Sequence, residues 1–377
     1  MGVVITPQSE IDKYFESDAL SQSSLKKLLT GIDSFINNQK EESELFYTEK
    51  GHFVIGSAVD MLLTGEKEEF DNHYYVSKLI KKPSEVEMSI IQRVLDDVKS
   101  NSEDSPYEKL DKYPGSIQMS IEEHGWQSNW KMETKINKII EIGSEYFEDL
   151  KKGLGKQILT SEEKKLIDDI VFSLKSNPRT SKFFDRTALS RAELVTVYYQ
   201  LPIYFYYKGI YCKALLDMLI VIRNEKGEIV SVQAFDLKTM NGNTLRFLSN
   251  LKSFRYDIQA AWYTEALLAS PSSFELEGKI REDMLRPFTF IVESNSYPGQ
   301  PLLFEADEDI LNTGKNGRKD LKVKLSTNDY EDTVIRHVVG FDELIDTYIY
   351  QNDNDWKEEE IITKNNGVLK FDWNGIK

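Results

Sequence analysis

The sequence predicts an α/β protein of the α+β kind, in which helices flank a mixed central β-sheet. Two apolar runs of strand length, 211–223 and 229–238, lie on either side of the turn signal 224–227, and together they predict a hairpin. Apolar residues recur at helical spacing over 250–268, which predicts an amphipathic helix. The stretch 84–150 is rich in Lys and Glu and indicates helices, so we expect an inserted helical lobe or lid there.

The N-terminal region is expected to contribute helices to the same core. Residues 1–20 predict an extended arm, and Ser21 is expected to cap a helix that runs over 22–30. A second, buried helix is predicted over 56–63, where it would bring Asp60 to the functional site. The alternative for Asp60 is a helix residue that faces solvent.

Downstream of the insertion, the pattern changes from helix to strand. Thr160 and Glu163 form a capping-box signature at the start of a helix with an apolar face. Strands are predicted over 192–199 and 202–207, joined by a turn at 200–202. These strands lead into the hairpin, so we expect all of them in one sheet.

Three charged residues of the hairpin indicate a metal site. Folding back about the turn sets Asp217 within a residue or two of Asp236, at the roughly 5 Å spacing of cross-strand partners. Asp236 and Lys238 are two apart on a strand and therefore share a face. Two carboxylates in an apolar sheet repel each other unless a cation lies between them, and oxygen ligands suit Mg²⁺ or Mn²⁺. The alternative is a pair of strand-end aspartates beside a solvated lysine.

The predicted helix adds two further polar side chains. Gln259 and Tyr263 are four residues apart, so they share one face of the helix. A strand over 288–293 follows, with Pro287 at its start, where a missing donor is tolerated. Without a functional role, Gln259 and Tyr263 would be a surface pair packed against the sheet.

In this order, Asp217, the triplet 236–238 and the pair Gln259 and Tyr263 resemble the PD-(D/E)xK nucleases, specifically the branch of the RecB nuclease domain and the RecE exonuclease. Upstream, the segment 19–25 resembles the Ser-x-Ser-x-Leu opening of RecE-like phage exonucleases. The resemblance implies a PD-(D/E)xK core, which is a mixed sheet flanked by helices, and metal-assisted hydrolysis of DNA.

The resemblance also implies a role for each site residue. The expected ligands of Mg²⁺ or Mn²⁺ are Asp217, Asp236 and the backbone carbonyl of Leu237, completed by Asp60 and Glu193. Asp60 stands where the family carries a histidine, and an exposed edge-strand residue is the alternative for Glu193. Lys238 would position the attacking water, while Gln259 and Tyr263 would contact the substrate phosphate or orient Lys238.

The implied activity is that of an exonuclease acting on the ends of linear double-stranded DNA. It would digest from a 5′ end and expose a 3′ single strand for recombination, with a single-strand annealing protein as partner and a homo-oligomeric ring as assembly. One alternative is the nuclease subunit of a helicase complex, whose motor would be another chain because no Gly-x-x-x-x-Gly-Lys-Ser/Thr loop occurs here. Two others are a catalytically inactive nuclease fold that binds DNA and a protein-interaction scaffold.

Basic residues beside the predicted helix are expected to contact DNA phosphates. Arg246, Lys252 and Arg255 lead into the helix of Gln259. The formal charge of −16 at pH 7 does not exclude a local basic groove, because much of the acid lies in segments typical of solvated surface. An ordinary solvated face is the alternative for each of these residues.

Composition sets the remaining limits. With 377 residues and no apolar run of membrane-spanning length, the chain is expected to be a folded cytoplasmic protein. The resemblance implies that the cell is bacterial or phage-infected. Its one cysteine, Cys212, excludes intrachain disulfides and a four-cysteine cluster, and its four histidines lack the spacing of zinc ligands. The predicted parts are an N-terminal contribution to the core, the insertion, the nuclease core and a C-terminal extension, over residues 1–83, 84–150, 151–305 and 306–377.

Overall fold

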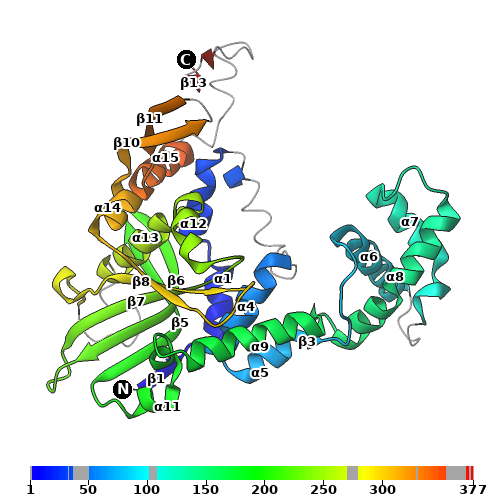
Figure 1. Cartoon of the computed structure of the whole chain (residues 1–377), viewed down its shortest axis with the longest axis horizontal. Helices are drawn as coiled ribbons and strands as arrows, with labels where there is room; N and C mark the ends of the chain where they lie inside the picture. The colour runs from blue at the N-terminus through cyan, green and yellow to red at the C-terminus, as the bar shows by residue number, and fades with distance from the viewer. Residues whose placement is uncertain are drawn as a thin grey trace. The chain divides into compact units, whose positions relative to one another are not determined.

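The computed structural model describes residues 2–32, 34–36, 51–101, 108–269, 279–327, 330–353, 371–372 and 375–376. They form a mixed α/β structure in two compact units (Figure 1). The first unit comprises Met1–Phe46 and Ser173–Lys377, and the second comprises Tyr47–Phe172. The predicted insertion 84–150 therefore lies inside the second unit, which begins before it and ends after it.

A mixed sheet of seven strands forms the centre of the first unit (Figure 1). Its strands are β1 (Gly2–Ile5), β2 (Leu20–Ser21), β5 (Val195–Tyr207), β6 (Ile210–Arg223), β7 (Ile229–Met240), β8 (Phe288–Ser294) and β9 (Leu302–Ala306). They follow the order β1-β5-β6-β7-β8-β9, with β2 paired to β6. The pairs β5–β6 and β6–β7 are antiparallel, whereas β7 and β8 run parallel, so the sheet is mixed as predicted.

Helices of the first unit cover this sheet. They are α1 (Gln8–Glu16), α2 (Gln22–Lys26), α10 (Ser181–Phe184), α11 (Arg186–Arg191), α12 (Phe247–Ser253), α13 (Tyr256–Ala269), α14 (Glu308–Asn316) and α15 (Phe341–Asp353), with 3-10 turns η1 (Lys27–Leu29), η4 (Thr244–Arg246) and η5 (Glu282–Met284). Two further strand pairs are β10 (Arg318–Thr327) with β11 (Tyr330–Val338), and β12 (Phe371–Asp372) with β13 (Gly375–Ile376).

The predicted hairpin is confirmed as β6 and β7. At the turn, the Asn224 amide donates to the Glu228 carbonyl at 2.9 Å, and Gly227 has φ of 82°, a left-handed conformation that glycine adopts without strain. From there the antiparallel ladder runs back to the pair Met218 and Phe235. The local signals of two apolar runs and one turn therefore position the centre of the sheet.

β5 is one strand where the sequence predicted two. Its pairing with β6 keeps one register on both sides of Gln200, which therefore lies opposite Asp217. Gln200 has φ of 53°, a strained value for a residue with a side chain, so the chain distorts locally and does not reverse. The turn prediction rested on Pro202, but β1 pairs with β5 only as far as Tyr199. Beyond that point β5 is an edge strand on this side, where proline's missing donor is tolerated.

The segment 250–268 is helical as predicted, but it belongs to two helices and not to one. α12 ends before Phe254, and Arg255, with φ of 53°, separates it from α13. α13 packs its fully buried Trp262 into the core of the first unit, and the Trp262 indole donates to the Lys213 carbonyl of β6 at 3.0 Å. This contact fixes α13 to the strand that carries Asp217.

The N-terminal segment is not the extended arm that was predicted. β1 pairs in parallel with β5, and α1 follows it. The buried ammonium of Lys213 holds the end of α1, because it donates to the carbonyls of Tyr14 and Ser17 at 2.8 and 2.7 Å. The predicted cap of α2 is confirmed, since Ser21 Oγ accepts a hydrogen bond from the Ser24 amide at 3.1 Å.

The second unit is mainly helical. Its elements are α4 (Gly51–Thr64), α5 (Lys67–His73), β3 (Tyr74–Val76), α6 (Glu85–Asn101), η3 (Leu110–Lys112), α7 (Pro114–His124), α8 (Met132–Gly153), β4 (Gln157–Leu159) and most of α9 (Ser161–Ser176). The capping box of α9 is confirmed, with Thr160 N donating to Glu163 Oε2 at 2.7 Å and Glu163 N to Thr160 Oγ1 at 3.0 Å. α6, α7 and α8 enclose a core of their own around Ile91 and Phe147.

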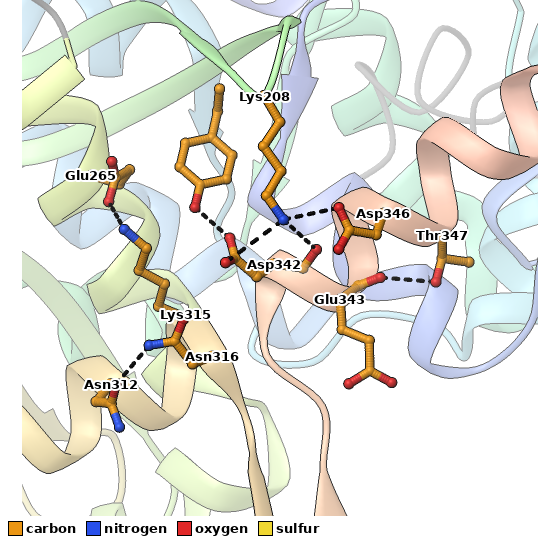
Figure 2. Close-up of polar contacts among 10 residues, drawn as sticks. Lys208, Glu265, Asn312, Lys315, Asn316, Asp342, Glu343, Asp346 and Thr347 are labelled. Carbon is orange, nitrogen blue, oxygen red and sulfur yellow. Dashed lines mark hydrogen bonds and ion pairs between the residues drawn. The ribbon is translucent and has the colours of Figure 1, made fainter.

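Ion pairs fasten the C-terminal helices to the rest of the first unit (Figure 2). Lys208, in the turn between β5 and β6, lies 2.9 Å from Asp346 and 3.7 Å from Asp342 of α15. Lys315 of α14 lies 2.6 Å from Glu265 of α13. Across the described ranges, no helix has both the length and the apolar character needed to cross a bilayer.

Candidate functional site

The hairpin brings the two predicted aspartates together. Met218 and Phe235 form the last pair of the β6–β7 ladder, so Asp217 and Asp236 are the next residues on the two strands. Asp217 Oδ2 accepts a hydrogen bond from the Leu237 amide at 2.7 Å, which holds its carboxylate against the neighbouring strand. Two acidic side chains thus meet at one point of the sheet.

Lys238 places an ammonium group beside this pair. Its Nζ lies 2.6 Å from Asp236 Oδ2, and the lysine side chain is only 22% exposed. Burial alone would lower the pKa of Lys238, but the charges of Asp236 and Asp217 outweigh it and raise the pKa above its ordinary value. Lys238 is therefore a fixed cation at neutral pH and does not act as a base.

The Asp236 carboxyl is almost completely buried, at 1% exposure. Its Oδ1 accepts a hydrogen bond from Gln259 Nε2 at 2.6 Å. Its Oδ2 touches the Lys238 ammonium at ion-pair distance, yet within the described part of the chain it accepts no hydrogen bond of acceptable geometry. Burial raises the pKa of Asp236, against the lowering effect of Lys238. A buried oxygen with a spare lone pair is a suitable ligand for a divalent cation.

One face of α13 supports the carboxylate. Tyr256, Gln259 and Tyr263 are spaced three and four residues apart and so lie on the same side of the helix. Besides its hydrogen bond to Asp236, Gln259 Nε2 donates to the Tyr263 hydroxyl at 3.2 Å. Burial, followed by the charge of Asp236, raises the pKa of Tyr263 well above its ordinary value, so its phenol stays neutral. In the structure Gln259 contacts Asp236, whereas the sequence analysis had expected it to contact Lys238 or the substrate phosphate.

The predicted ligand Glu193 does not join this site. Its neighbour Leu194 accepts a hydrogen bond from the Arg223 amide at 2.8 Å, at the far end of β6. Arg223 lies six residues from Asp217 along that strand, which corresponds to about 20 Å of extended chain. Glu193 is exposed in the turn that precedes β5, so it faces water and not the site.

Asp60 belongs to the second unit, where the Thr64 hydroxyl donates to the Asp60 carbonyl at 2.8 Å and to its Oδ1 at 3.2 Å. Its role as a metal ligand stays a prediction. Among the residues whose side chains the structure describes, no three His, Cys, Asp or Glu form a cluster able to hold a metal. Two carboxylates are nevertheless a sufficient protein contribution for Mg²⁺, which usually keeps several waters.

The three predicted DNA contacts differ in their surroundings. Arg246 and Lys252 are exposed on η4 and α12 and remain predicted phosphate contacts. Arg255 is only 16% exposed and makes two hydrogen bonds to Asp257, at 3.0 and 2.8 Å, and one to the Val339 carbonyl at 2.6 Å. Because its guanidinium is occupied by protein groups, we leave Arg255 out of the proposed DNA contacts.

Two residues near the site were missed by sequence reasoning. Tyr256 lies under the Lys238 ammonium, which is 5.2 Å from the ring centroid, and its spacing of three residues from Gln259 was a usable signal. Lys26 of α2 lies 5.9 Å from the same ring centroid. No local pattern connects Lys26 to the hairpin, because the two are far apart in the sequence.

Comparisons with known proteins give little beyond this geometry. No family model matches the chain, and no curated protein matches it. A solved structure from Eubacterium rectale that bears the name "Putative exonuclease" is similar at a TM-score of 0.28 and 14% identity, over 65% of this chain and 77% of that one.

Proposed function

We propose that this protein is a metal-dependent deoxyribonuclease that hydrolyses phosphodiester bonds of DNA. The observation that carries the proposal is the buried carboxylate of Asp236, paired with Lys238 and set beside the second carboxylate of Asp217. Burying such charges costs stability, and an apolar sheet gains nothing from them. A catalytic role accounts for their retention.

The proposed metal is Mg²⁺ or Mn²⁺, held by Asp217, Asp236 and the backbone carbonyl of Leu237. Asp236 Oδ2 supports this assignment, because this buried oxygen is paired with the Lys238 ammonium at 2.6 Å and has no other partner among the described residues. The donor set is all oxygen, which matches the preference of these ions. When bound, the ion would supply a Lewis acid and lower the pKa of a water molecule.

The remaining side chains act directly on the substrate or on the carboxylates. Lys238, which keeps its proton, would stabilise negative charge on the phosphate as it passes through its pentacovalent state. Gln259 holds Asp236 in one orientation through its 2.6 Å hydrogen bond. Arg246 and Lys252 are exposed and would bind phosphates of the flanking DNA.

The finer assignment follows the motif resemblance to RecE-like members of the PD-(D/E)xK nucleases. On this basis we propose linear double-stranded DNA as the substrate, digested from a 5′ end to leave a 3′ single strand. Asp60 would be a further metal ligand, a single-strand annealing protein the partner, and a homo-oligomeric ring the assembly. The setting would be recombination in a bacterial or phage-infected cytoplasm.

The test is a cleavage assay on linear duplex DNA labelled at either the 5′ or the 3′ end, with Mg²⁺, Mn²⁺ or EDTA. We expect metal-dependent release of the 5′ label by the wild-type protein. Asp217→Ala and Lys238→Ala should abolish it, because each removes a group of the proposed site. Glu282→Ala, which removes an exposed carboxylate of the same unit, should cleave like the wild type.

Four outcomes would count against the proposal. Full activity of the Asp217→Ala protein would remove the assigned site. DNA binding without cleavage would favour the inactive nuclease fold, and cleavage only after addition of a helicase would favour the subunit alternative. Cleavage of covalently closed circular DNA would show that the protein is an endonuclease and not an exonuclease.

A further inference from the structure

Lys26 brings a second ammonium group to the site from a distant part of the sequence. It lies at the end of α2, and its Nζ donates to the Phe254 carbonyl at 3.2 Å. The same Nζ lies 5.9 Å from the ring centroid of Tyr256, whose other cationic neighbour is Lys238 at 5.2 Å. Two lysines therefore converge on one aromatic ring beside the carboxylates.

The surroundings of Lys26 leave its charge poorly compensated. Burial, then the charge of Lys238, lowers the pKa of Lys26 to about 8, and Arg255 acts in the same direction. Asp236 and Asp257 oppose this shift, but Asp236 already contacts Lys238, and Asp257 already contacts Arg255. An additional anion would relieve the repulsion between the cations, and a substrate phosphate is such an anion.

Phe254 supplies a different kind of surface at the same place. It lies in the break between α12 and α13, and its side chain is 56% exposed. Its ring lies 5.7 Å from that of Tyr256, so the exposed ring lies one aromatic contact away from both lysines. An exposed aromatic ring beside a cation is the combination that holds unpaired nucleotides, because bases stack on the ring and phosphates bind the cation.

Building on the proposed function, we propose that Lys26 and Phe254 form a nucleotide subsite next to Lys238. In this subsite Lys26 binds a phosphate of the substrate strand, and the ring of Phe254 stacks on an unpaired base of that strand. The reacting strand is thus held as a single strand beside the carboxylates, although the DNA as a whole is a duplex. Lys26 and Phe254 are substrate-binding residues in this account, and neither takes part in the chemical step.

Direct binding tests the subsite without requiring cleavage. The probe is a fluorescent DNA duplex with a short single-stranded end, titrated with protein in EDTA and followed by anisotropy. We expect Lys26→Met and Phe254→Ser each to weaken binding by about tenfold, the scale of one charge-assisted contact or one stacked base. Lys26→Arg and Phe254→Tyr keep the charge and the ring, so they should bind close to wild type. Lys27→Met, which removes the neighbouring positive charge, is the matched control.

A pH series separates a direct contact from a structural effect. Binding by the wild type should weaken as pH rises through about 8, where Lys26 loses its proton, and Lys26→Arg should remove that dependence. The facing groups Lys238 and Tyr256 keep their protons over this interval because their pKa values are raised, while Asp236, Asp257 and Arg255 complete the set of charges around Lys26.

The outcomes distinguish the subsite from the nuclease proposal. Wild-type affinity in both Lys26→Met and Phe254→Ser would overturn the subsite, as would an equal loss in Lys27→Met. Loss of binding in the two variants, with no cleavage by wild-type protein in Mg²⁺, would overturn the nuclease and retain the subsite. A wild-type protein that binds no DNA would contradict both. Thermal melting of each variant shows whether a loss of binding comes from unfolding. If it does, the pH series on Lys26→Arg and the binding of Phe254→Tyr decide whether the contacts are direct.

Discussion

Two neighbouring strands of the sheet each bury a carboxylate, and the two carboxylates have different partners. Glu293 near the end of β8 is fully buried, and it accepts hydrogen bonds from the amides of Ser294 at 2.8 Å and Gly299 at 3.1 Å and from the Ser173 hydroxyl. Asp236 on β7 is as deeply buried, but it faces Lys238 and keeps one oxygen without a hydrogen bond in the described structure.

On this difference we base the proposal that Glu293 is structural and Asp236 functional. Neutral donors surround Glu293, and its hydrogen bonds connect α9, the end of β8 and the loop that follows. Asp236 is held by the Gln259 amide from α13 and paired with the Lys238 ammonium, and its Oδ2 accepts no further hydrogen bond from the described residues. Burial alone therefore does not mark a site, whereas burial combined with incomplete hydrogen bonding and an adjacent cation does.

The largest expected effect comes from neutralising each carboxylate in turn. Asp236→Asn should lower the rate of DNA cleavage by about a thousandfold, because it removes a proposed metal ligand and the partner of Lys238. Glu293→Gln should retain cleavage per folded molecule but lose about 2 kcal/mol of stability, since one acceptor of a buried network becomes a donor. Cleavage rates and urea unfolding of the two variants measure both effects. A Glu293→Gln protein that is well folded but inactive would contradict the purely structural role of Glu293.

A second effect concerns the lysine. Lys238→Met leaves the Asp236 carboxylate buried without its counter-charge, so the free energy of unfolding in EDTA should fall by about 3 kcal/mol. Adding Asp236→Asn to this variant should restore most of the loss, because no buried charge then remains. Equal stability of the single and the double variant would show that Lys238 does not balance Asp236.

The smallest expected effect tests whether Gln259 of α13 orients Asp236. Gln259→Leu removes the 2.6 Å hydrogen bond to Asp236 and should lower the cleavage rate by about tenfold. Because Gln259 acts through the carboxylate, the loss should appear in kcat with little change in KM. A variant that loses only substrate affinity would instead place Gln259 on the DNA.

Local patterns account for the parts of the fold that were predictable. The hairpin of β6 and β7 and the cap at Ser21 depend on residues close together in the sequence. The break between α12 and α13 depends on Arg255, whose guanidinium reaches the Val339 carbonyl 84 residues downstream. The turn signal at Pro202 failed for a similar reason, because where β1 stops pairing with β5 decides whether proline is tolerated there.

The candidate site shows the same division. Asp217, Asp236 and Lys238 could be predicted because one hairpin carries them, whereas the contact between Lys26 and Phe254 spans 228 residues and leaves no periodic signal. Glu193 was misplaced because its distance from Asp217 depends on the register of β5 against β6, which sequence patterns do not give. Residues brought together by register or by distant helices therefore needed the structure.

Calorimetric titration of the protein with Mn²⁺ asks whether Asp217 and Asp236 hold a divalent ion. We expect the wild type and Glu293→Gln to bind the ion, whereas Asp217→Ala and Asp236→Asn should lose most of the heat of binding while remaining folded. Unchanged Mn²⁺ binding in the two aspartate variants would show that the ion lies elsewhere and that the proposed site is wrong.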